Sequence, residues 1–169
     1  YGVPALFAAH GVYMIACAGL LWMRLPPEPS AAAHPISLGA VLARHVTIYR
    51  SPFIAAPGIG WLFYTLSFVS ILTLLPPFVA PEVRVLVIGA MPLISIASSL
   101  LLGVRLLTWF SPVAVMQMGF LGSALSAAAL ALVPGQPVIC LLLAAALGLV
   151  QGAGFAAVPH LNASADDRA

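Results

Sequence analysis

Uncharged hydrophobic runs alternate with short polar stretches along this chain. A helix that crosses a bilayer needs about 20 consecutive apolar residues. Five runs reach that length, at residues 1–24, 51–76, 85–104, 112–133 and 138–158. We therefore predict five transmembrane helices.

Charges and turn residues set the ends of these predicted helices. An arginine at the bilayer centre costs about 2.5–3.5 kcal/mol, so Arg84 and Arg105 should bracket the third helix. Residues 106–165 carry no charge, and one helix of that length would measure about 90 Å, too long for a bilayer. The turn signal Pro134-Gly135-Gln136-Pro137 divides this run in two, and Pro159 should end the fifth helix.

The stretch between the first and second runs, residues 25–50, is the one long polar segment. Its first part is rich in proline. Its second part carries apolar and ring side chains at helical spacing: Leu38, Val41, Leu42, His45 and Tyr49. The spacing predicts either a short amphipathic helix on the membrane surface or a cytosolic turn packed on the bundle.

Composition leads to the same class of protein. The chain is 63% hydrophobic and 6% charged, with a mean hydropathy of +1.13, whereas soluble domains carry about 25% charged residues. The pattern predicts an all-α integral membrane protein, a polytopic helix bundle whose first partner is the lipid bilayer. The few scattered arginines form no basic face, which argues against nucleic acid as a partner. The chain starts inside an apolar run at Tyr1, so we interpret it as an internal piece of a longer protein.

The positive-inside rule gives an orientation. With loop 25–50 and the C-terminal end in the cytoplasm, every arginine except Arg84 lies on the cytoplasmic side. These are Arg24, Arg44, Arg50, Arg105 and Arg168. We predict this orientation for a multi-pass protein of the cell membrane.

Small residues recur every four positions in the last two predicted helices. Such spacing lets helix backbones approach closely in lipid. The two series are Gly119, Ser123 and Ala127, then Ala144, Gly148 and Gly152. They predict a tightly packed bundle but specify no partner.

Several segments, taken together, resemble a known family. Arg24-Leu25-Pro26, the long loop and Tyr49-Arg50-Ser51-Pro52 resemble the middle of a major facilitator superfamily (MFS) transporter. The stretch from Gly60 to Pro76 is similar to the seventh helix of bacterial members. Residues 151–169, from Gln151-Gly-Ala-Gly to Asp167-Arg168-Ala169, resemble the tenth helix and the loop that follows it.

The turn between the third and fourth runs resembles the second-half copy of the family's conserved cytoplasmic loop. Gly103, Arg105, Ser111 and Pro112 fit that loop motif, whereas Thr108 stands where an aspartate is usual. Trp109 and Val113 replace arginines of the motif as well. The departures put a charge-relay gating role for this turn in doubt.

The resemblance implies a partial MFS fold made of helices six to ten of twelve. Residues 1–24 would be the last helix of the N-terminal half, and 25–50 the cytoplasmic linker. Residues 51–169 would be part of the C-terminal bundle. The implied function is secondary active transport of a small solute, of unknown identity, across the cytoplasmic membrane by alternating access, in a bacterial inner membrane. The remaining helices of the same transporter would be its partners.

Polar and aromatic side chains inside the predicted helices are the candidates for function, because they are costly in lipid. In the resembled fold, helices seven and ten line the substrate cavity. On these helices the candidates for the cavity are Trp61, Tyr64, Ser67 and Gln151. For Gln151, a substrate contact and a structural bond between helices are equally open.

Other polar positions favour structural roles. The serines at 95, 98 and 99 could contact a solute, but serines in helices more often bond to carbonyls of their own helix. His10 is the one histidine inside a predicted span, and its peripheral place in the resembled fold favours a structural role over proton relay.

The same residues argue against catalysis. No predicted span contains Asp or Glu, and no metal-ligand, nucleotide-binding or nucleophile motif is present. We predict no catalytic residues, no metal and no cofactor, and hence no enzyme. The alternative to a transporter is a polytopic membrane scaffold or assembly subunit without a transport cycle.

Overall fold

The computed structural model describes residues 2–24 and 37–162, which form helices and turns without a β-strand among them. The all-helical fold predicted from the hydrophobic pattern is confirmed for this part of the chain. Two units are present, Tyr1–Leu38 and Gly39–Ala169. Residues 25–36 of the linker and the C-terminal residues 163–169, which include Arg168, lie outside the described residues.

The first unit contains one long helix, α1 (Val3–Arg24). Nearly all of its side chains are exposed, including Phe7 and Trp22. His10 is also exposed, and its ring centroid lies 6.3 Å from that of Tyr13. An apolar helix with so little burial needs lipid or another protein surface to cover it.

The second unit begins with the short helix α2 (Leu38–Arg50), in the stretch whose spacing predicted one. Two of its polar side chains contact backbone carbonyls of the same helix. The Thr47 hydroxyl donates to the Ala43 carbonyl at 3.0 Å, and His45 Nδ1 lies 2.9 Å from the Val41 carbonyl oxygen.

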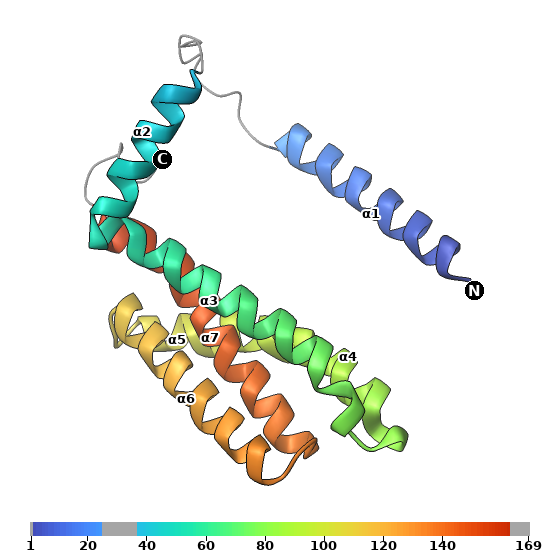
Figure 1. Ribbon diagram of the computed structural model, residues 1–169. Coiled ribbons are helices and arrows are strands. Elements are labelled where there is room, and N and C mark those ends of the chain that lie inside the picture. The colour runs from blue at the N-terminus through green and yellow to red at the C-terminus, as the bar shows by residue number, and fades with distance from the viewer. Residues whose placement is uncertain (1, 25–36, 163–169) are drawn as a thin grey trace. The chain divides into compact units, whose positions relative to one another are not determined.

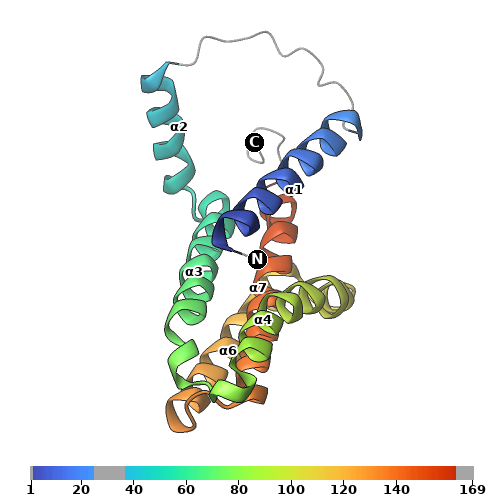
Figure 2. The same cartoon turned by 90° about the vertical axis from the view of Figure 1, so that its right-hand side faces the viewer.

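The rest of this unit is a bundle of long helices (Figures 1 and 2). They are α3 (Pro52–Leu74), α4 (Pro81–Ala97), α6 (Pro112–Leu132) and α7 (Pro137–Leu161), with a 3-10 turn, η1 (Pro76–Phe78), between α3 and α4. The π-helix η2 (Ser98–Gly103) and α5 (Val104–Leu107) extend α4. Helices α6 and α7 form an antiparallel hairpin (Figure 1).

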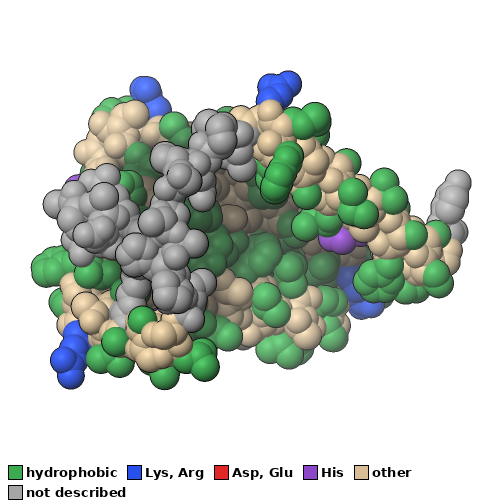
Figure 3. Space-filling model, turned by 90° about the horizontal axis from the view of Figure 1, so that it is seen from above, with side chains coloured by type: hydrophobic (Ala, Val, Ile, Leu, Met, Phe, Trp, Pro, Cys, Tyr) green, Lys and Arg blue, Asp and Glu red, His purple; other side chains and the backbone are tan. Residues whose placement is uncertain are grey.

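Among the described residues, five helical segments are long and apolar enough to cross a membrane. They are Val3–Arg24, Pro52–Leu74, Pro81–Leu107, Pro112–Leu132 and Pro137–Leu161. Many hydrophobic side chains are exposed on the face seen in Figure 3. Length and composition therefore fit a multi-pass membrane protein.

Three of the long helices start with the same local device. A polar side chain just before the helix accepts a hydrogen bond from the backbone N–H three residues later, and proline takes the first helical position. The capping bonds are Ser51 to Ile54, Ser111 to Ala114, and Gln136 to Ile139. Proline is well suited to this position because its missing N–H would have no partner there.

Helix α7 is the centre of the bundle, in contact with α3, α4 and α6. In its most apolar window 44% of the residues are buried, against 17–22% for the other three long segments of this unit. Leu143, Leu147 and Val150 are almost fully buried on it. The buried face of α7 is therefore where this helix meets its neighbours.

Glycines on α6 and α7 mark the closest helix contacts. A Cβ added to Gly148 would overlap the Ser95 carbonyl of α4, and one added to Gly152 would lie 2.6 Å from Ser99 Oγ. At Gly119 it would lie 2.9 Å from the Val150 nitrogen. The close approach predicted from small residues is thus confirmed at these three glycines.

Two helix ends differ from the predicted bounds. The helical segment Pro81–Leu107 extends beyond the predicted span 85–104 at both ends, because α4 starts at Pro81 and α5 carries the helix on to Leu107. Pro159 does not end the fifth span, because α7 continues to Leu161. A proline there removes one backbone bond in the last turn, and Asn162 closes the helix by donating to the Val158 carbonyl.

Candidate functional site

Two candidate residues from the sequence meet between α3 and α7. The Tyr64 hydroxyl donates to Gln151 Oε1 at 3.1 Å, across 87 residues of sequence. Tyr64 is 7% exposed and Gln151 is half-buried. The interhelical bond left open for Gln151 is therefore present.

Aromatic rings surround this pair. Trp61, Tyr64 and Phe68 share one face of α3 because they are three and four residues apart. The ring centroids of Trp61 and Tyr64 lie 5.1 Å apart, and those of Tyr64 and Phe68 lie 5.7 Å apart. The ring centroid of Phe155 on α7 lies 4.7 Å from that of Trp61. The predicted residue Trp61 thus connects Tyr64 with Phe155, which the sequence did not single out.

Ser67, the fourth predicted cavity residue, is not brought into this group by any hydrogen bond. It is half-buried, and its hydroxyl makes none with the described residues. Ser95 of α4, rather than Ser67, is the serine that lies next to Tyr64. Its side chain lies beside Tyr64 and is 1% exposed, and its hydroxyl has no hydrogen-bond partner among the described residues.

The serines of α4 and η2 do not behave as predicted. Ser98 donates to the Ala145 carbonyl of α7 at 2.7 Å instead of to its own helix. Ser99 packs against Gly152. The expectation of bonding within one helix was wrong for Ser98 because the glycine face of α7 brings a neighbouring carbonyl within reach.

A hollow of about 250 Å³ lies between α3 and α7, next to the aromatic group. Its lining is Pro57, Gly58, Trp61, Gly154, Phe155 and Val158. Gly154 lies close to the Trp61 ring, since a Cβ added there would be in van der Waals contact with Trp61 Cε3 at 3.7 Å. A second hollow of about 450 Å³ shares Gly58 and Trp61 with the first.

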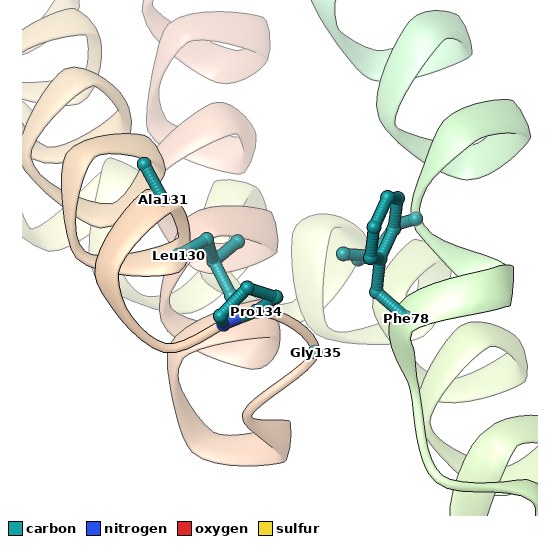
Figure 4. Close-up of a pocket in the computed structure, with 6 residues that line it drawn as sticks. Phe78, Leu130, Ala131, Pro134 and Gly135 are labelled. Carbon is teal, nitrogen blue, oxygen red and sulfur yellow. The ribbon is translucent and has the colours of Figure 1, made fainter.

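Another hollow, of about 230 Å³, lies where α6 turns into α7 (Figure 4). Phe78 of η1 faces Leu130 and Pro134 across it (Figure 4). Gly135 has φ 71°, and a Cβ there would overlap the Phe78 carbonyl, so the turn requires glycine. The lining is apolar and offers no polar side chain to a solute.

The four residues of the predicted cytoplasmic-loop motif build the turn between α5 and α6. Gly103 is buried where η2 ends, and the Arg105 guanidinium lies 4.5 Å from the centroid of the Trp109 ring. Ser111 caps α6 and Pro112 begins it. Each has a local structural role, and the Arg105 guanidinium stacks on the Trp109 ring.

Sequence reasoning missed Phe155 as a member of the site, and it left Ser95 open between a solute contact and a bond to its own helix. Phe155 lies four residues after Gln151, so helical spacing from a candidate would have indicated it. No group of three His, Cys, Asp or Glu side chains within residues 2–24 and 37–162 is placed to hold a metal ion. The chemistry that remains is hydrogen bonding by neutral groups and contact with aromatic rings.

Comparisons of the chain with protein-family models, curated proteins and solved structures gave no match.

Proposed function

We propose that this chain is part of a secondary active transporter that moves a small solute across the cytoplasmic membrane by alternating access. The observation that carries the proposal is the Tyr64–Gln151 hydrogen bond between α3 and α7, beside an aromatic hollow. Polar groups inside apolar helices are costly and mark solute pathways in membrane proteins. The sequence resemblance to the MFS supports the same function.

The chemistry of the pair suits a reversible contact. Both groups are neutral, so neither leaves a buried charge when the bond between them opens. A hydrogen bond between membrane helices contributes about 0.6 kcal/mol on average. A solute that offers Gln151 or Tyr64 a replacement bond therefore competes at little cost, and its departure lets the helices pair again.

The alternative is a polytopic scaffold or assembly subunit without a transport cycle. One observation favours it: the Gln151 carbonyl already has a partner in Tyr64. Under this alternative the bond only fastens α3 to α7, and its loss would lower stability without changing any flux.

The deciding experiment is transport by the intact protein that contains this chain. Cells that express it are tested with labelled sugars, amino acids, organic acids, nucleosides and neutral aromatic compounds, and uptake or efflux is measured. We expect Tyr64→Phe and Gln151→Ala to change transport of the responding solute at least several-fold.

Matched controls come from the same bundle. Gln117→Ala removes the same side chain from an exposed position of α6, and Phe63→Leu changes an exposed ring on α3. Both should transport like the unmodified protein. Transport that survives unchanged in Tyr64→Phe and Gln151→Ala would remove these residues from the solute pathway. A full-length protein with only five or six spanning helices, rather than twelve in two related halves, would contradict the transporter.

A further inference from the structure

The hollow between α3 and α7 has a lining whose chemistry restricts its occupant. Its walls are aliphatic and aromatic, with the Trp61 and Phe155 rings in contact at a centroid distance of 4.7 Å. A flat ring gains most from such walls, because aromatic groups stack offset or edge to face. A cavity of about 150 Å³ holds benzene, so a volume of about 250 Å³ suits a compound of two fused rings.

No charged side chain belongs to this lining. From Pro52 to Leu74 and from Pro137 to Pro159 the sequence contains no Asp, Glu, Lys, Arg or His. The first such residues beyond these two stretches in the sequence that lie next to the hollow's helices, Arg50 and His160, are exposed and are not part of the lining. Phe155 is 65% exposed, so the hollow is open on one side. An anion that enters it would still exchange part of its water shell for a lining without a countercharge.

A cation should also bind weakly in this hollow. A ring such as Trp61 attracts a cation enough to tighten binding by about thirtyfold at best. Removing the ion from water weakens binding by about a thousandfold or more. Loss of hydration therefore outweighs the attraction of the ring, and a neutral solute is favoured over either ion.

One polar group near the hollow is available to such a solute. Gln151 precedes Gly154 and Phe155 of the lining by three and four residues, so it lies on the same face of α7, one turn away. Its carbonyl accepts from Tyr64, while its amide nitrogen has no acceptor among the described residues. This N–H group can donate to an oxygen on the solute.

We propose that the hollow binds an uncharged, planar, two-ring aromatic compound that carries a hydrogen-bond acceptor. The rings lie against Trp61 and Phe155, and the acceptor is directed toward the Gln151 amide nitrogen. The proposal rests on the proposed transport function, because it names the solute class of that same site.

The test is equilibrium dialysis of the purified intact protein in detergent micelles at pH 7, with empty micelles as the blank. Four labelled probes share one ring system: 2-naphthol, naphthalene, 2-naphthoate and 2-naphthylmethylammonium. We expect 2-naphthol to bind at least about tenfold more tightly than either ion. We expect naphthalene to bind about fivefold more weakly than 2-naphthol, which is the effect of one hydrogen bond. An ion that binds as tightly as 2-naphthol would overturn the proposal.

Variants locate the binding. Trp61→Leu keeps an apolar side chain but removes the ring, and should weaken 2-naphthol about tenfold, while Trp61→Phe should restore most of the affinity. Trp109→Leu removes an exposed tryptophan outside the hollow and should have no effect. Gln151→Leu should remove the preference for 2-naphthol over naphthalene, and Gln117→Leu should keep it. Equal affinities for Trp61→Leu and Trp109→Leu would place the binding elsewhere and contradict the proposal.

Flux measurements separate this proposal from the transport function. If 2-naphthol binds in the expected order but energised cells neither accumulate nor exclude any solute, the transporter is contradicted and the ligand class of the hollow stands. If a charged solute is transported and displaces 2-naphthol, the ligand class is contradicted and the transporter stands.

Discussion

Tyr64 and Gln151 bring a phenol and an amide together between two helices made almost entirely of apolar residues. Such bonds contribute little to membrane protein stability, because a polar group in the unfolded membrane state also finds partners. The value of the pair therefore lies in placing two neutral polar groups beside an aromatic hollow. Ser95, almost completely buried next to Tyr64, adds a third polar group, a hydroxyl from α4.

The Tyr64–Gln151 bond should be measurable as a coupling free energy. Tyr64→Phe, Gln151→Leu and the double variant are compared by thermal or denaturant unfolding in detergent. We expect a coupling of about 0.5–1.5 kcal/mol, the range of interhelical bonds in membranes. Purely additive effects would mean that the two groups do not interact in the folded protein.

Glycine positions allow a sharper test of residue-level packing. In Gly148→Ala the new methyl group overlaps the Ser95 carbonyl, so α4 and α7 must separate. We expect a loss of about 1–3 kcal/mol in unfolding free energy. Gly89→Ala is the matched control, since its methyl group meets open space on α4. It should be neutral or stabilise by up to about 1 kcal/mol, and a similar loss in both variants would contradict close packing at Gly148.

At the scale of elements, the sequence predicts helices well and their mutual rotation poorly. Long apolar runs decide that helices form, and glycines four residues apart indicate that α7 packs closely, although only the structure shows that α4 is the neighbour. The partner of Gln151 depends on how α3 and α7 are rotated against each other, which no local pattern records. For the same reason Ser98 was assigned to its own helix, although it donates to α7. Pro159 misled because proline is tolerated when only one turn remains.

Ser111, a residue of the predicted loop motif between α5 and α6, should stabilise the helix that follows it. Ser111 Oγ accepts from the Ala114 N–H at 3.2 Å and caps α6. Ser111→Ala should therefore lower the unfolding free energy by about 0.5–2 kcal/mol. Ser111→Asp should keep most of the stability that the cap contributes, because aspartate is also a good capping residue. Unfolding in detergent measures both. Equal stability of Ser111→Ala and the unmodified protein would show that the cap contributes nothing.

At the scale of the molecule, the exposed apolar surface is the dominant fact. In the most apolar stretches of α3, α4–α5 and α6, only 17–22% of the residues are buried. In the corresponding stretch of α1, no residue is buried. Helices with so much exposed apolar surface need a nonaqueous environment around them. Lipid, together with the remaining helices of a larger bundle under the proposed function, would supply it.

Arg84 and Arg105 lie near opposite ends of the 27-residue segment Pro81–Leu107, about 40 Å at 1.5 Å per residue, enough to cross a bilayer core of about 30 Å. The positive-inside rule predicts that the Arg105 end faces the cytoplasm.

Single cysteines at two exposed sites test this orientation, Glu82→Cys near one end and Thr108→Cys near the other. The free Cys17 and Cys140 are replaced by serine and alanine. With a membrane-impermeant maleimide, Glu82→Cys should react in intact cells and Thr108→Cys only after permeabilisation, while the cysteine-free parent stays unlabelled. Reaction of both sites in intact cells would mean that the segment does not cross the membrane. The reverse pattern would turn the whole predicted orientation over, loop 25–50 included.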